Sequence, residues 1–226
     1  MLEPNNIYLG DSLELMKQIP DKSIDCVITD PPYGIGFMYE GKEKIDNPKE
    51  YGEFLSKILL EANRITKDDA FMCFFQTQKY FRYFWEWFGE DIRIFISAKN
   101  FVQLRKTHVN YGYDPVVFKV KGNYKVTNKP KNNLDYDITN TAGLVSDTSR
   151  LERAHPAPRT LDVMRRIISN FTNENDLILD PFLGSGTTAI ACYDLKRRYI
   201  GIEKEPKYYD IAKKRIAEFE AQGRLF

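Results

Sequence analysis

The chain has 226 residues and a formal net charge of +1 at pH 7, which excludes a strongly basic or acidic protein. This length suits one large domain, or a domain with an insertion, and is enough to bury a sizeable core. No apolar run approaches the roughly 18 residues of a membrane span, and the amino terminus lacks a signal pattern. We therefore expect a cytoplasmic protein that does not associate with membranes. The three cysteines lack CxxC spacing, which predicts buried thiols and no metal site.

The first third of the chain alternates between short apolar runs and helical periodicity. We expect strands at 7–9, 26–29 and 71–75 and helices at 13–18 and 51–65. Ser12 is the expected cap of the first helix. Asp11 is interpreted either as a second capping acid or as a ligand contact. Residues 34–50 are interpreted as a loop, which either closes over a substrate or is simply solvated.

The alternation continues to the end of the chain. We expect helices at 80–88, 160–170, 189–195 and 207–221, and strands at 92–96, 115–120, 177–179 and 199–202. Buried strands that alternate with amphipathic helices predict an α/β fold, with a mostly parallel twisted sheet and helices on both faces.

The segment Asp30-Pro31-Pro32-Tyr33 directly follows a buried strand. It is expected at the carboxyl end of that strand, where open α/β sheets bind ligands. The prolines remove two backbone donors, so the Asp30 carboxylate and the carbonyls around Pro31 remain as acceptors beside the Tyr33 ring. Such acceptors suit a planar heterocycle that bears an amino group. The alternative is a strand that ends in a proline turn.

The strand at 177–179 runs into a glycine-rich turn, which is followed by a helix and by a strand that ends at Glu203. Glycines let a backbone approach a ligand closely, and an acid about 20 positions further on bonds a ribose diol. This layout is typical of adenosine binding. The turn is neither GxGxxG nor a P-loop, which leaves S-adenosylmethionine as the remaining common adenosine cofactor. The alternative is a turn used only for tight packing.

Taken together, these motifs resemble the amino-methylating DNA methyltransferases with a DPPY motif. In their β-class order, the catalytic motif precedes the target-recognition segment and the cofactor motif. Gly10-Asp11-Ser12 matches the family's amino-terminal element, whose acid lies near the cofactor adenine. Gly201-Ile202-Glu203 matches the segment after the cofactor motif. His155-Pro156 matches the family's His-Pro element, although its usual continuation is replaced here by Ala157-Pro158-Arg159.

The resemblance covers residues 5–33 and 155–219. It implies a Rossmann-like S-adenosylmethionine-dependent methyltransferase fold over residues 1–226, with a small target-recognition insertion at about 121–150. The implied catalytic residues are Asp30, Pro31, Pro32 and Tyr33. The implied cofactor-binding residues are Asp11, His155, Pro156, Arg159, Asp180, Pro181, Phe182, Gly184, Ser185, Gly186, Thr187, Glu203 and Lys204.

Strands 27–30 and 177–180 are expected to be neighbours, so that the target amine and the cofactor methyl meet in one crevice. Asp30 and the Pro31 carbonyl would accept the two hydrogens of the amine and expose the lone pair of its nitrogen. A duplex base must first be flipped out, and Tyr33 is the proposed stacking partner.

Residues 99–133 contain eight cations against one carboxylate, interleaved with tyrosines. Cations attract phosphate and aromatic rings stack on bases, so a nucleic acid is the expected partner; a solvated basic face is the alternative. The resemblance implies that this nucleic acid is double-stranded DNA. The predicted DNA contacts are Lys99, Arg105, Lys106, Lys121, Lys125, Lys129 and Lys131.

We therefore predict a site-specific DNA methyltransferase that makes N6-methyladenine. The choice of adenine comes from the resemblance alone, through Asp rather than Ser at position 30. N4-methylation of cytosine, methylation of RNA or of a protein amide, and an inactive DNA-binding module are the alternatives. A homodimer and a companion restriction endonuclease are left open as partners.

Overall fold

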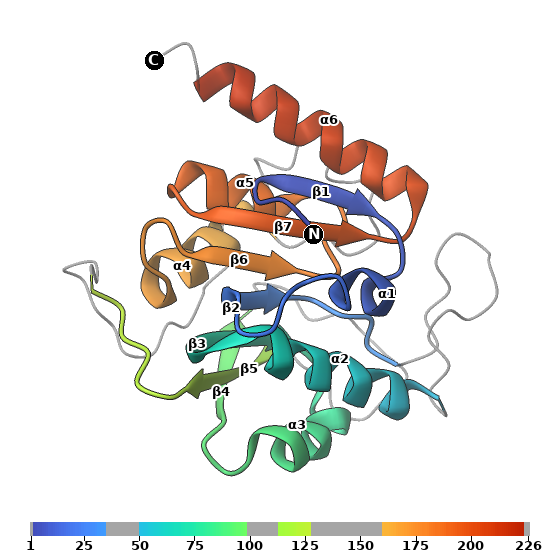
Figure 1. Ribbon diagram of the computed structural model, residues 1–226, viewed down its shortest axis with the longest axis vertical. Helices are drawn as coiled ribbons and strands as arrows, with labels where there is room; N and C mark the ends of the chain where they lie inside the picture. Colours follow the sequence, from blue (N-terminus) through green and yellow to red (C-terminus); the bar gives the residue numbers. More distant parts are fainter. Residues whose placement is uncertain (1, 35–49, 99–112, 128–159, 224–226) are drawn as a thin grey trace.

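The computed structural model describes residues 2–34, 50–98, 113–127 and 160–223. Its centre is a 7-stranded sheet in the order β1-β7-β6-β2-β3-β5-β4 (Figure 1). The strands are β1 (Asn6–Leu9), β2 (Ile24–Thr29), β3 (Thr66–Phe75), β4 (Arg93–Ala98), β5 (Tyr113–Lys121), β6 (Leu177–Asp180) and β7 (Arg198–Glu203). The helices are α1 (Ser12–Met16), α2 (Tyr51–Ile65), α3 (Phe81–Phe88), α4 (Leu161–Phe171), α5 (Thr187–Asp194) and α6 (Pro206–Gly223), and a 3-10 turn, η1 (Gln78–Tyr80), precedes α3.

The strands from β1 to β3 in this order are parallel, whereas β5 is antiparallel to both of its neighbours. At the centre, β2 pairs with β6, with Val27 opposite Leu179. The connections lead away from this pair in opposite directions, from β6 to β7 on one side and from β2 to β3 on the other. The pair is thus a topological switch point, which forms a crevice at the carboxyl ends of its strands. The predicted adjacency of the two motif strands is confirmed.

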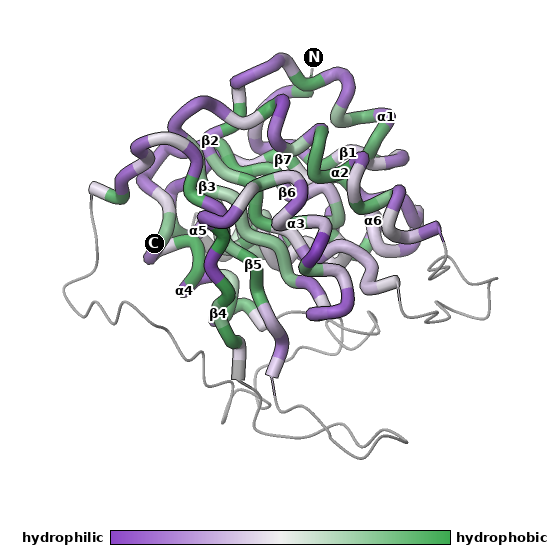
Figure 2. Tube along the Cα trace, turned by 90° about the horizontal axis from the view of Figure 1, so that it is seen from below, coloured by the Kyte–Doolittle hydropathy of each residue, from purple (hydrophilic) through white to green (hydrophobic). Residues whose placement is uncertain are grey.

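Helices cover both faces of the sheet, as predicted. Successive residues of a strand point to opposite faces, so β2 sends Val27 to one core and Cys26 and Ile28 to the other. The core around Val27 is covered by α1, α2 and α3, and the core around Cys26 by α4, α5 and α6. In Figure 2 the central strands are mostly green (hydrophobic), and the purple (hydrophilic) stretches lie mainly in the helices and turns around them. This is the α/β layering expected for a Rossmann-like fold.

One local prediction is wrong, because Ser12 does not cap the first helix. The cap is Asp11, whose Oδ1 accepts hydrogen bonds from the backbone N–H groups of Leu13 at 3.0 Å and Glu14 at 3.4 Å. The Ser12 hydroxyl instead donates to the carbonyl of Pro181 at 2.5 Å. Ser12 is already the first residue of α1, so the residue before it, Asp11, occupies the cap position and its carboxylate takes that role.

The remaining predicted elements are present where the structure describes them, with shifted ends; β3, for example, begins at Thr66 rather than at Phe71. All three cysteines are buried free thiols. No helix within the described ranges is both long and apolar enough to cross a membrane. The loop predicted at 34–50 lies outside the described residues except for its two ends, and the insertion predicted at 121–150 lies outside them after residue 127.

Candidate active site

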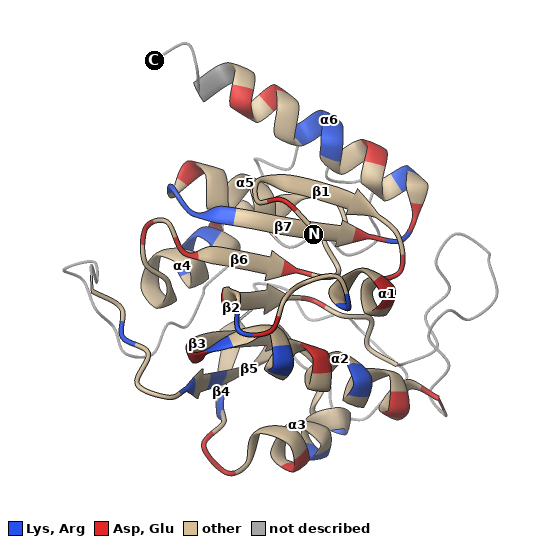
Figure 3. Ribbon diagram, in the orientation of Figure 1, with Lys and Arg blue, Asp and Glu red and all other residues tan. Residues whose placement is uncertain are grey.

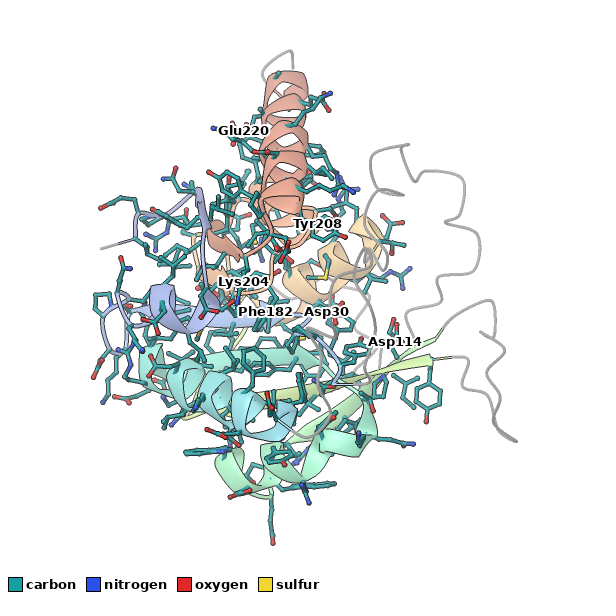
Figure 4. All side chains as sticks on the ribbon, turned by 90° about the vertical axis from the view of Figure 1, so that its right-hand side faces the viewer. Asp30, Asp114, Phe182, Lys204, Tyr208 and Glu220 are labelled. Atoms are coloured by element: carbon teal, nitrogen blue, oxygen red, sulfur yellow. The ribbon has the colours of Figure 1, made fainter. Side chains whose placement is uncertain are left out.

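Four acidic residues of the predicted motifs lie at one edge of the sheet, at or just after the carboxyl ends of β1, β2, β6 and β7. They are Asp11, Asp30, Asp180 and Glu203. Figure 3 shows acidic residues at the tips of β6 and β7, and Figure 4 shows that Asp30, Phe182 and Lys204 gather at this edge. Backbone bonds join the strand ends, as where the N–H of Gly10 donates to the carbonyl of Glu203 at 2.9 Å. The fold therefore brings both predicted motifs to one place.

Asp180 ties the two motifs together. Its Oδ1 accepts from the Thr29 hydroxyl at 2.7 Å and from the Phe182 N–H at 3.1 Å, and its Oδ2 accepts from the Thr188 hydroxyl at 2.6 Å. Burial raises the pKa of Asp180 to about 6, although these hydrogen bonds oppose the shift. Because Thr29 directly precedes Asp30, the Thr29–Asp180 bond fixes the start of the catalytic motif against the start of the cofactor motif.

The glycine-rich turn after β6 is held from two sides. Gly184 and Gly186 have φ of +57° and +88°, a region that favours glycine. Glu203 Oε2 accepts from the Gly184 N–H at 2.8 Å, and burial raises the pKa of this carboxyl. On the other side, the buried Arg215 of α6 donates from Nη1 to the Ser185 carbonyl at 2.6 Å and to its hydroxyl at 2.8 Å. A turn without Cβ atoms at two positions, beside a buried carboxylate, fits an adenosine cofactor with a ribose diol.

Asp11 and Lys204 form an ion pair across the ends of β1 and β7. Lys204 Nζ lies 3.0 Å from Asp11 Oδ2. Burial tends to raise the pKa of Asp11, but the hydrogen bond and charge of Lys204 outweigh it, so the pKa is lowered. Asp11 is thus a helix cap that also contacts a second predicted cofactor residue. Its contact with a ligand remains a prediction.

The catalytic segment leaves β2 along a path set by neighbouring side chains. Pro31 is buried, while Asp30, Pro32 and Tyr33 are half-buried. The Pro32 carbonyl accepts a hydrogen bond from Gln76 Nε2 at 3.3 Å, and the Gly34 carbonyl accepts one from the Tyr80 hydroxyl at 2.6 Å. The segment is therefore held through its carbonyls, from the side of the sheet that carries β3.

The remaining predicted residues either lie outside the described part of the chain or lie away from this edge. His155, Pro156, Arg159, Lys99, Arg105, Lys106, Lys129 and Lys131 lie outside the described residues. Lys121 lies near the amino end of β3, at the opposite edge of the sheet, where its Nζ donates to the carbonyls of Asn63 at 2.8 Å and Thr66 at 3.1 Å. Burial lowers the pKa of Lys121. The nearby Lys125 accepts a bond from Asn173 through its carbonyl. The structure thus separates these two lysines from the predicted motifs.

Three residues that position the motifs were missed by the sequence reasoning. Thr29 and Gln76 are polar residues at or directly after the end of a buried strand, a signal that was available. Arg215 lies four positions from both Ile211 and Phe219, which belong to the inward-facing stripe of α6. This spacing predicts that Arg215 also lies on the inward-facing side of the helix. The hydrogen-bond partners of these three residues could not be predicted from the sequence, because each partner belongs to another part of the fold.

An α/β sheet of this order, with an acceptor-rich segment and a glycine turn joined at its switch point, defines the class of Rossmann-like methyltransferases. Residues 24–214 match the family described as DNA methylase (N6_N4_Mtase), and the chain belongs to this family. Its members are DNA methyltransferases that act on amino groups and use S-adenosylmethionine.

Curated relatives resemble the chain over most of its length. The type II methyltransferase M.HpaI of Haemophilus parainfluenzae is 27% identical, over 93% of this chain and 73% of the relative. The DNA adenine methyltransferase YhdJ of Escherichia coli (strain K12) is 26% identical, over 95% of this chain and 83% of the relative.

Solved structures agree with the fold. The complex of M1.HpyAVI with S-adenosylmethionine has a TM-score of 0.71 at 30% identity and covers 93% of this chain and 98% of its own. The PvuII DNA methyltransferase, described as cytosine-N4-specific, has a TM-score of 0.74 at 18% identity, over 97% of this chain and 92% of its own. At that identity, the PvuII enzyme supports the fold alone.

Proposed function

We propose that this chain transfers a methyl group from S-adenosylmethionine to the N6 amine of adenine in double-stranded DNA. The observation that carries the proposal is the 2.7 Å hydrogen bond from Thr29 to Asp180, which fixes the two motifs at the switch point of the sheet. The choice of adenine is supported by Asp30 in the catalytic motif and by the similarity to YhdJ, a DNA adenine methyltransferase. A homodimer and a companion endonuclease remain predictions.

The cofactor half of the site consists of the turn from Gly184 to Thr187, with Glu203, Phe182 and the Asp11–Lys204 pair around it. When bound, S-adenosylmethionine supplies an electrophilic methyl group on a sulfonium. The buried Glu203 carboxylate is suited to accept hydrogen bonds from a ribose diol. The glycines expose backbone to the rest of the ligand. His155, Pro156 and Arg159 remain predicted contributors.

The catalytic half has to activate a weak nucleophile. The lone pair of an exocyclic amine is delocalised into the ring, and localising it on nitrogen requires acceptors for both hydrogens. We assign these roles to the Asp30 carboxylate and the Pro31 carbonyl. The new C–N bond would form as the methyl–sulfur bond of the sulfonium breaks, with the sulfur leaving as a neutral thioether. Asp30 is placed to stabilise the positive charge on the nitrogen and to accept the proton that the nitrogen then loses. Positioning and electrostatics then supply the catalysis, without a covalent nucleophile.

The target base must leave the duplex to reach this edge, which costs a few kcal/mol. Stacking on Tyr33 offsets part of this free energy. The predicted DNA contacts at Lys99, Arg105, Lys106, Lys129 and Lys131 remain part of the proposal. Lys121 contributes less to DNA binding than these residues do, because its ammonium group donates to backbone carbonyls at the opposite edge of the sheet.

The test uses the purified chain, radiolabelled S-adenosylmethionine and mixed-sequence DNA from a methylation-free host, followed by digestion to nucleosides. The expected product is labelled N6-methyldeoxyadenosine. If the labelled product is N4-methyldeoxycytidine, the target base is cytosine rather than adenine, and the proposed methyl transfer to an amino group still holds. Effective competition by RNA would contradict the assignment of DNA as the substrate. A folded protein that binds the cofactor and labels no nucleoside would overturn the proposal.

A further inference from the structure

Gln76 is a fully buried polar residue that directly follows the last residue of β3. Burying an amide is unfavourable unless its hydrogen-bonding groups find partners. Here the partners are the catalytic segment, the first residue of α2 and the next residue of the chain. A buried amide that reaches from one strand end to the proposed catalytic segment calls for a role beyond packing.

The orientation of the Gln76 amide is fixed by its surroundings. Its Oε1 accepts from the Thr77 N–H at 2.8 Å, which turns Nε2 toward the Pro32 carbonyl at 3.3 Å and the Tyr51 hydroxyl at 2.5 Å. The backbone N–H of Gln76 donates to the Pro115 carbonyl of β5 at 3.2 Å. The two hydrogens of the Gln76 side-chain amide are therefore directed at the Pro32 carbonyl and the Tyr51 hydroxyl by a residue whose backbone is fixed to β5.

The catalytic segment needs such a donor because of its own composition. Pro31 and Pro32 have no N–H, so these two residues can be fixed by hydrogen bonds only through their carbonyls. Tyr80 provides a second donor, to the Gly34 carbonyl, and its ring centroid lies 4.6 Å from that of Tyr51. Two packed tyrosines thus connect the two donors. Gly34 has φ of +61°, and a Cβ there would meet the Tyr51 ring and the Tyr80 hydroxyl.

We propose that Gln76 is a positioning residue for methyl transfer. By holding the Pro32 carbonyl toward β3, it keeps the Asp30 carboxylate and the Pro31 carbonyl in place for the target amine. The inference rests on the proposed function, which makes those two groups the acceptors. Because displacement of a reacting group by about 1 Å can slow a reaction about 10²-fold, a loose segment should slow transfer without weakening the cofactor site.

The decisive variant is Gln76→Glu, which keeps the shape of the side chain and places a carboxylate oxygen against the Pro32 carbonyl. With unmethylated plasmid DNA and labelled S-adenosylmethionine, kcat should fall roughly 10- to 100-fold. The KM for DNA and the Kd of the cofactor, measured by calorimetry, should stay within about threefold. Gln18→Glu is the matched control on an exposed residue and should leave all three values unchanged.

Hydrogen exchange gives a readout that does not depend on activity. In Gln76→Glu, amide exchange should accelerate in the peptide that contains residues 24–34 and stay unchanged in the peptide that contains 177–188. If Gln76→Glu fails to fold, Tyr51→Phe removes the hydroxyl that accepts from the Gln76 amide and should show the same pattern, with a loss in kcat of about threefold.

Unchanged exchange at 24–34, unchanged kcat, or equal losses in kcat and cofactor affinity would each overturn the proposal. A wild-type chain that methylates another base, while exchange at 24–34 still responds, would contradict the proposed function and leave the positioning by Gln76 standing. A wild-type chain that methylates no base would overturn both, even if exchange at 24–34 showed that Gln76 holds the segment.

Discussion

The two halves of the site are held by opposite kinds of chemistry. The catalytic segment after β2 is fixed by neutral donors, the Gln76 amide and the Tyr80 hydroxyl, which bind its carbonyls. The cofactor turn after β6 is fixed by charged groups, among which Glu203 accepts from the Gly184 N–H and Arg215 donates to Ser185. Part of this difference follows from the backbone, since the prolines leave only acceptors to be held, whereas Gly184 has an N–H group that Glu203 can bind.

This contrast suggests why the halves can be perturbed separately. Charge-assisted hydrogen bonds are roughly twice as strong as neutral ones, so the cofactor turn is held more firmly than the catalytic segment. The two halves meet at the Thr29–Asp180 bond. Substitutions on either side of this bond should therefore affect either catalysis or cofactor binding, and those at the bond should affect both.

The largest expected effect on one half comes from Asp30→Ala. Removing the carboxylate takes away one of the two proposed acceptors, so kcat should fall by roughly 10²- to 10³-fold or more. The Kd of S-adenosylmethionine, measured by calorimetry, should change by less than about threefold. Asp68→Ala, at an exposed carboxylate paired with Lys22 at the far end of β3, is the matched control. Equal losses of cofactor affinity and rate would contradict the separation of the halves.

Asp180→Asn tests the junction through the pH dependence of stability. Burial raises the pKa of Asp180 from 3.8 to about 6, so the folded chain retains a proton that the unfolded chain releases between those pH values. The stability contributed by this group is present below about pH 4 and is lost as the pH rises through about 6. Asparagine does not titrate. Relative to wild type, the free energy of unfolding of the variant in urea should therefore rise by roughly 2 kcal/mol between pH 4 and pH 7.

A difference between Asp180→Asn and wild type that stays constant over this pH range would show that the carboxyl titrates normally. The same variant should lower both kcat and cofactor affinity, because it weakens the bond to Thr29. Loss of only one of these two quantities would place Asp180 within a single half of the site.

Arg215→Met should weaken the cofactor half alone. It removes the guanidinium that donates to the carbonyl and hydroxyl of Ser185. Hydrogen bonds to charged groups contribute about 1.5–3 kcal/mol, so the Kd of S-adenosylmethionine should rise roughly 10- to 100-fold. Arg215→Lys keeps a charged donor, so its Kd for S-adenosylmethionine should lie between those of wild type and Arg215→Met. At saturating cofactor, kcat should recover to within a few fold; a persistent deficit would show that the turn also positions the catalytic segment.

The smallest expected effect is that of Tyr80→Phe. It removes one neutral hydrogen bond, to the Gly34 carbonyl, and should lower the free energy of unfolding by about 1 kcal/mol and kcat by a few fold. Urea unfolding and steady-state kinetics measure the two effects. Tyr83→Phe, whose hydroxyl accepts from Arg82 at the surface, is the control. A larger loss than that of Gln76→Glu would make Tyr80, rather than Gln76, the main support of the segment.

Much of the fold was readable from the sequence because its signals are local. The apolar stripe of α2 predicted a helix over 51–65, and the structure has it at Tyr51–Ile65. Strand ends were harder to predict, since the first residues of β3, Thr66 to Asp69, are polar, and this end of the strand joins the sheet through the pairing of Thr66 with Ile24 of β2. The role of Ser12 was misread for a related reason, because its true partner, Pro181, is 169 positions away.

The sequence by itself determined the two motifs, their order and the strands that carry them, since proline, glycine and apolar runs restrict the backbone wherever they occur. Only the tertiary structure decided which groups hold the motifs. The bond from Thr29 to Asp180 joins residues 151 positions apart, and that from Gln76 to Pro32 joins residues 44 positions apart. Such contacts depend on strand order and register, which arise when whole elements pack and leave no trace in local spacing.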